Sequence, residues 1–365
     1  MGLRLRPVLR IVRRLLGILV VIVALFLALT PIGRYLAHAA WAEGRILADR
    51  RPIAGIITDP QADPRVRHKL ELVLAARRFA VDSVGLVAGE SFTTYSRVEH
   101  DTLVLVLSGA YQDRLEPYTW WFPIVGRVPY KGFFDFSAAF AAARQLEARG
   151  YDAYVRPSAA FSTLGWFNDP LLSTTLRGDS VELANTVIHE LTHNTFYAPG
   201  QAVFNESFAN FVGTRGAAWF FRARGDSARA AASDAEWEDE RAMGRFWDAL
   251  YASLDSAFTA HPSSKAARLA ARDTVYERAE ALFNDSTIPA LHTIHPRTRV
   301  RLRLNNASLL ANRIYRTRLD LFDAVYDREG HDLRRTVRRI IALAKSRPKD
   351  PFGAVGEWVG GRVSQ

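Results

Sequence analysis

Near its middle the chain reads Ser180-Val-Glu-Leu-Ala-Asn-Thr-Val-Ile-His-Glu-Leu-Thr-His-Asn-Thr-Phe-Tyr-Ala-Pro-Gly200. Asp179 and Glu182 form a capping pair at the start of this stretch, its apolar residues recur at helical spacing, and a Pro-Gly pair ends it. The stretch therefore predicts a helix. On that helix His189 and His193 stand one turn apart, so their imidazoles can converge on one metal ion.

The two histidines belong to the pattern H-E-x-x-H, in which Glu190 lies beside the metal without binding it. A catalytic zinc ion takes three protein ligands and leaves a fourth position open. A second predicted helix begins near Phe204 and carries Glu206 in its first turns. Because the loop between the helices is short, they can pack antiparallel and bring Glu206 over the histidines. We therefore predict Zn²⁺ bound by His189, His193 and Glu206.

The same pattern predicts a peptidase mechanism with Glu190 as the general base. Zinc makes water easier to ionise, and a neighbouring carboxylate can take its proton during attack on a peptide carbonyl and pass it to the leaving amine. The oxyanion that develops needs a hydrogen-bond donor. Tyr315 is our first candidate, although a buried helical tyrosine is commonly a core residue. His292 and His295 follow, unless they are surface residues of a loop.

Asn210 lies one turn beyond Glu206 and has two interpretations. A metal-bound histidine usually donates its second ring N–H to an oxygen, and the Asn210 side-chain carbonyl is one such acceptor. Asn210 can equally be a polar residue on a solvated helix face.

Composition limits the other choices. The chain has 365 residues, 48% of them hydrophobic, which suffices for one large domain or two packed lobes. It has no cysteine, so disulfides, thiolate metal sites and a cysteine nucleophile are excluded. The formal net charge is +10. The arginines gather before an apolar run and between Arg297 and Lys349 without a nucleic-acid-binding signature, and we predict no nucleic-acid partner.

The N-terminal segment predicts the compartment. Arginines at 4, 6, 10, 13 and 14 precede an apolar run from Leu15 to Leu29 that extends to Ile32, close to the roughly 20 residues needed to cross a bilayer. This charge asymmetry places the N-terminus in the cytoplasm. We predict a single-pass inner-membrane protein with its catalytic domain on the extracytoplasmic, periplasmic side. Two alternatives are a signal peptide cleaved after Ala37-His38-Ala39 and a buried core helix.

The remaining patterns predict an α+β fold. An aliphatic strand at 102–107, a helix at 137–149 and a strand at 151–155 indicate a small mixed sheet in the first half, and the second half is almost wholly helical by period. We divide the chain into a basic segment and anchor at 1–34 and a zinc peptidase domain at 35–365. That domain comprises a sheet-containing lobe at about 35–200 and a helical lobe at about 201–365.

The sequence resembles a family of bacterial predicted aminopeptidases, zinc proteins of the gluzincin type. The resemblance runs from about Tyr35 to about Leu343 and is strongest, besides the H-E-x-x-H, in residues 121–134, 161–172, 202–209 and 304–307, and weaker in residues 329–333. It implies that His189, His193 and Glu206 are ligands, that Glu190 is catalytic, and that the substrate is a peptide or protein.

Two features depart from the family pattern. Many members resemble lipoproteins with an acylated cysteine, whereas this chain would be anchored by its apolar helix. Thermolysin-like gluzincins usually have aspartate where Asn210 stands, and a neutral acceptor raises the basicity of a ligand less. Fold-level likeness leaves aminopeptidase and endopeptidase activity both open, and a metal-stabilised, non-catalytic envelope scaffold is the alternative to an enzyme.

Overall fold

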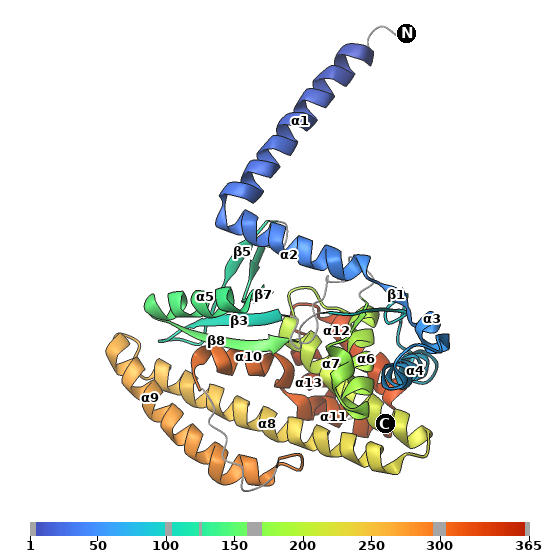
Figure 1. Cartoon of the computed structure of the whole chain (residues 1–365). Coiled ribbons are helices and arrows are strands. Elements are labelled where there is room, and N and C mark those ends of the chain that lie inside the picture. The colour runs from blue at the N-terminus through green and yellow to red at the C-terminus, as the bar shows by residue number, and fades with distance from the viewer. Residues whose placement is uncertain (1–4, 99–103, 124–125, 159–169, 295–303, 362–365) are drawn as a thin grey trace.

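The structure, a computed structural model, describes residues 5–98, 104–123, 126–158, 170–294 and 304–361. Helix α1 (Leu5–Leu29) projects away from the body of the molecule (Figure 1). Its apolar side chains from Leu9 onward are largely exposed. Residues Leu9–Leu29 are long and apolar enough to cross a membrane, a property that signal sequences share.

Helix α2 (Pro31–Ala48) connects α1 to the body. Thr30 caps it by accepting a hydrogen bond from the Gly33 amide at 2.8 Å, and proline occupies its first position, as is common in helices. Its Tyr35 ring packs on Phe122 and Phe133, with ring centroids 5.7 and 6.0 Å away. The helix is therefore held against the sheet region beneath it.

The largest sheet is antiparallel and centred on β3 (Val104–Tyr111). Strand β8 (Tyr151–Ser158) pairs along the whole of β3, and β7 (Tyr130–Phe133) and β4 (Pro117–Tyr118) pair with successive parts of it. Helix α5 (Phe136–Ala148) covers one face with its apolar side chains. On the other face lies α10 (Asn306–Arg316), whose Asn306 amide donates to Asp152 on β8 at 2.8 Å (Figure 1).

Two smaller sheets accompany it. Strand β2 (Thr94–Ser96) pairs antiparallel with β1 (Arg51–Pro52) and parallel with β9 (Leu171–Leu172), and β5 (Trp120–Phe122) forms a hairpin with β6 (Gly126–Val128). The first half of the chain thus contains several small sheets where the sequence predicted one. Parallel and antiparallel pairing occur together in the sheet of β1, β2 and β9, whose strands have only two or three residues.

Helices make up most of the rest of the described chain. In the first half they are α3 (Ile53–Thr58) and α4 (Pro64–Phe79), which continues as a π-helical turn at Ala80–Val84. After a 3-10 turn at Thr175–Arg177 come α6 (Ser180–Thr195), α7 (Ala202–Ala223), α8 (Ser227–Thr259), α9 (Lys265–Leu282), α10, α11 (Leu319–Arg328), α12 (Leu333–Ser346) and α13 (Pro351–Gly360). A π-helical turn (Phe283–Thr287) and a 3-10 turn (Ile288–Ala290) follow α9. The α+β class and the mainly helical second half are confirmed.

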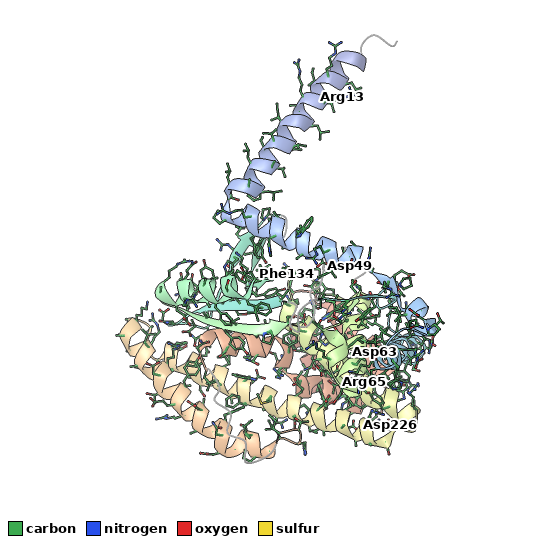
Figure 2. The ribbon with its side chains drawn as sticks, in the orientation of Figure 1. Arg13, Asp49, Asp63, Arg65, Phe134 and Asp226 are labelled. Atoms are coloured by element: carbon green, nitrogen blue, oxygen red, sulfur yellow. The ribbon has the colours of Figure 1, made fainter. Side chains whose placement is uncertain are left out.

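Aspartate side chains cap α4 and α8, two of these helices. Asp63 caps α4 by accepting from the Arg65 amide at 2.7 Å, and Asp226 caps α8 in the same way through Arg229. Figure 2 shows Asp63 and Arg65 together at the start of α4. His295 and parts of two family-like segments, residues 124–125 and 161–169, lie outside the described residues.

The main core lies between α4, α6, α7 and the C-terminal helices. Trp237 of α8 is fully buried in it against Phe211 of α7, and its indole N–H donates to Asp323 of α11 at 2.8 Å. Residues from both halves of the chain line this core. The boundary between lobes near residue 200, like the boundary at residue 34, stays a prediction.

Candidate metal centre

Helix α6 carries both histidines. Asp179 caps it by accepting from the amides of Val181 and Glu182 at 2.7 and 3.0 Å, so the capping part of the predicted pair is present. The buried face of α6 carries Val187, Ile188 and Leu191. His189 and His193 lie beside that face, partly exposed, and point to the same place.

The structure brings His189, His193 and Glu206 into one cluster. The two Nε2 atoms are 3.3 Å apart, and the Glu206 Oε2 atom lies 3.4 Å from His189 and 3.6 Å from His193. Two ligand atoms bound to one zinc ion at about 2.0–2.2 Å with a tetrahedral angle lie about 3.3–3.6 Å apart. The spacing and the two-nitrogen, one-oxygen donor set therefore fit a zinc ion, and the three groups could hold a metal.

Asn205 explains why α7 returns over α6. Its buried side chain accepts a hydrogen bond from the Ala198 amide and donates one to the Ala198 carbonyl, both at 2.9 Å. These two bonds fix the loop between the helices, where Gly200 has a φ of 76° that glycine adopts without strain. Sequence reasoning missed Asn205, although it directly precedes the predicted ligand Glu206.

Two glycines of α7 allow its close approach to α6. A Cβ atom on Gly213 would lie 2.3 Å from the Asn185 side-chain oxygen and 3.1 Å from the Cβ of His189. One on Gly216 would lie 2.9 Å from Ile188. The two glycines on this face of α7 therefore set the distance between α6 and α7, the helices that carry the cluster.

We expect Gly213→Ala to weaken both the fold and the metal site. The added methyl displaces the Asn185 side chain and crowds the Asn185 carbonyl oxygen and the His189 Cβ at 3.1 Å, and overpacking of this kind typically costs about 1–3 kcal/mol. Melting temperature and zinc affinity should both fall. Gly55→Ala is the matched control, because no atom lies within 4 Å of its added Cβ. Unchanged zinc affinity in Gly213→Ala would show that the close approach is not required.

Charges within the cluster stabilise one another. Burial alone would raise the pKa of the Glu206 carboxyl, but its hydrogen bonds to His189 and His193 hold that pKa well below its usual range. Burial by itself would lower the pKa of the His193 imidazole. The hydrogen bond to Glu206 and the negative charges of Glu206 and Glu190 have a larger, opposite effect, so the pKa of His193 is raised. A metal cation bound between His189, His193 and Glu206 would take the place of the protons in these hydrogen bonds.

Glu190 and Tyr315 lie near this cluster. Glu190 is partly exposed on α6, and its negative charge acts on both His193 and the Tyr315 hydroxyl. Burial and the charge of Glu206 raise the pKa of Tyr315. The Ser207 hydroxyl holds the end of α10 on α7 by donating to the Ile314 carbonyl and accepting from the Thr317 amide, both at 3.1 Å.

The other sequence candidates lie elsewhere. The Asn210 amide donates to Glu240 at 2.9 Å and to the Tyr315 carbonyl at 3.1 Å, and within the described residues no hydrogen bond joins it to either histidine. The expected carbonyl acceptor for a ligand histidine is therefore not Asn210 in this structure. The His292 side chain is exposed, and its backbone amide donates to Asp239 at 2.7 Å.

An acidic pocket of about 340 Å³ adjoins Asn210 and Tyr315. Five carboxylates line it, from Asp179, Glu182, Glu236, Asp239 and Glu240. Burial and then the neighbouring carboxylates raise the pKa of Glu236 to about 7. Sequence reasoning found no such acidic group, because its members come from two separate segments, the start of α6 and the middle of α8.

Fold and site together define an α+β protein with a His-His-Glu cluster that could bind a metal ion. A protein-family model described as "Putative aminopeptidase" matches residues 34–351, and the chain belongs to this family. Membership suggests a peptidase. No curated protein and no solved structure matches the chain.

Proposed function

We propose that the protein is a membrane-anchored, zinc-dependent peptidase that hydrolyses peptide bonds. The observation that carries the proposal is the tetrahedral spacing of His189, His193 and Glu206 with Glu190 adjacent on the same helix. Three protein ligands leave a coordination position open, as catalytic zinc sites do, whereas structural sites are normally closed by four. This favours an enzyme over a metal-stabilised scaffold.

The residues of the site divide the chemistry between them. Zinc, when bound, supplies a Lewis acid that polarises the scissile carbonyl and makes water easier to ionise. Glu190 takes a proton from the attacking water as the carbon–oxygen bond forms, and returns it to the amine nitrogen as the carbon–nitrogen bond breaks. Tyr315 donates a hydrogen bond to the carbonyl oxygen as it becomes negative. The products are a carboxylate and an amine.

Aminopeptidase activity is the form that we propose. The family description supports it, and the acidic pocket beside Tyr315 supports it because carboxylates stabilise the positively charged amino terminus of a peptide. The test compares hydrolysis of one peptide series with free and with acetylated amino termini. Cleavage of the free forms only supports the proposal, and equal cleavage within both forms indicates an endopeptidase. If zinc-loaded protein cleaves neither form, the scaffold alternative gains.

We expect the protein to fractionate with the inner membrane, with residues 35–365 outside the cytoplasm. The exposed apolar surface of α1 and the arginines that precede its apolar run support an anchor formed by residues 1–34. Membrane fractionation combined with protease accessibility measures both points. A mature N-terminus at Ala40 would instead show a cleaved signal peptide.

A further inference from the structure

Arg156 lies on the face of the main sheet that packs against α10. Side chains alternate along a strand, so Asp152, Tyr154 and Arg156 of β8 share a face, and Asp152 contacts the start of α10. The Arg156 Nη2 atom donates to the Tyr315 hydroxyl oxygen at 3.3 Å, and the guanidinium carbon lies 5.5 Å from the centre of that ring. Strand β8 thus delivers a positive charge to the candidate oxyanion donor.

No carboxylate neutralises this charge within the described residues. Two partly buried arginines of the helical half pair with acids, Arg215 with Asp323 at 2.8 Å and Arg316 with Glu240 at 2.7 Å. By contrast, Arg156 donates a hydrogen bond to Tyr315. Its Nε atom is buried without a partner, as is the Nε atom of Arg316. A partly buried guanidinium without a carboxylate partner needs an explanation, and the contact of Arg156 with the candidate oxyanion donor offers one.

The direction of this hydrogen bond decides what the Tyr315 hydroxyl can do. A guanidinium has five N–H donors and no acceptor, so the tyrosine oxygen must accept from Arg156 and point its own proton elsewhere. Hydrogen bonds hold this end of α10 beside Glu206 on α7, because Ser207 donates to the Ile314 carbonyl and Asn210 donates to the Tyr315 carbonyl, both at 3.1 Å. The charge of Arg156 lowers the pKa of Tyr315, whereas the charges of Glu206 and Glu190 raise it.

We propose that Arg156 is a positioning residue that fixes the Tyr315 hydroxyl so that its proton faces the reacting peptide carbonyl at the metal centre. This inference rests on the proposed peptidase function. Arg156 also polarises the O–H bond, which strengthens the hydrogen bond that forms as the carbonyl oxygen becomes negative. It acts through Tyr315 and does not contact the substrate.

The first test is a double-mutant cycle on the zinc-loaded protein. Arg156→Met should lower kcat by about 10- to 100-fold with little change in KM, since loss of an entire oxyanion donor typically costs about 10² to 10³. In the Y315F background the same change should cost less than about twofold, because Arg156 then has no hydroxyl to direct. Arg156→Lys should restore part of the rate. Equal losses in both backgrounds would overturn the proposal.

Arg149→Met is the matched control. The Arg149 Nη1 atom donates to the Tyr118 hydroxyl at 3.4 Å, a similar contact on the α5 side of the sheet. We expect this variant to keep wild-type kcat and KM. A kcat loss equal to that of Arg156→Met would show that any arginine–tyrosine contact of the sheet has the effect, and would overturn the specific role.

The second test needs no activity. Tyr315 is replaced by a fluorinated tyrosine whose hydroxyl titrates near neutral pH, and its fluorine resonance is followed with pH in metal-free protein. An opposite charge at this distance shifts a pKa by about 1 to 3 units, so Arg156→Met should raise the titration midpoint by about 1 unit or more. An unchanged midpoint would overturn the proposal.

Two outcomes separate this inference from the proposed function. If the wild-type, zinc-loaded protein hydrolyses no peptide, the proposed function fails and this role fails with it. If hydrolysis is normal but Arg156→Met raises KM only for peptides with a free terminal carboxylate and spares amidated ones, Arg156 contacts the substrate directly. In that case the positioning role alone is overturned.

Discussion

Glu190→Gln is expected to bind zinc as the wild-type protein does and to lose peptide hydrolysis by about 10²- to 10⁴-fold or more. Glu190 directly follows His189 on α6, and its charge acts on His193, although no hydrogen bond joins it to the cluster within the described residues. The amide has nearly the same shape as the carboxylate but accepts a proton very poorly. Fold and metal should therefore persist while the proton transfer fails.

The measurement pairs elemental analysis with hydrolysis of a peptide library at neutral pH. Glu280→Gln is the control, because Glu280 is exposed on α9, away from the cluster. It should match the wild type in both readouts. Near-wild-type turnover in Glu190→Gln would show that another group takes the proton, and the mechanism proposed above would be wrong.

The cluster itself could be predicted from the sequence because local rules generate it. One helical turn separates His189 from His193, a Pro-Gly pair ends that helix, and a short loop forces the next helix back. Glu206 then has few places to lie. The helix start at Asp179 followed from capping rules that operate within four residues, and that cap is present.

The residues that refine the site lie far apart along the chain, and no local pattern marks them. Arg156 meets Tyr315 across 159 residues, and Asn210 meets Glu240 across 30. The sequence suggested Asn210 as an acceptor for a ligand histidine because it lies one turn after Glu206 on the same helix. That spacing cannot show that Glu240 of α8 accepts a hydrogen bond from the Asn210 side-chain amide. The acidic pocket combines α6 with α8 in the same way.

The small sheets were underestimated for a related reason. Strand β3 spans eight residues and has a clear aliphatic pattern, so the sequence revealed it, although residues 102–103 of the predicted strand lie outside the described residues. Strands β1 and β9 have two residues each and pair with β2 from distant parts of the chain. Two residues carry no periodicity, so only tertiary pairing defines these strands.

Removal of a single ligand is the second large effect that we expect. His193→Ala should lose most of the one zinc ion per chain that the purified region from about Tyr35 binds, His189→Ala should behave alike, and Glu206→Gln should lose both zinc and hydrolysis. Each variant removes one of three groups that lie 3.3–3.6 Å from one another. Two remaining protein ligands cannot complete a three-ligand catalytic site.

Zinc-dependent stability gives a readout separate from activity. An ion that binds only the folded state stabilises it by about 4 kcal/mol at a free concentration a thousand times its Kd, so zinc should raise the melting temperature of the wild type strongly. In His193→Ala the affinity falls and the rise should nearly vanish. In Glu190→Gln the rise should remain, since Glu190 is not one of the three proposed ligands. Full zinc occupancy of His193→Ala by elemental analysis, or an undiminished rise in its melting temperature, would exclude His193 as a ligand and require a different metal site.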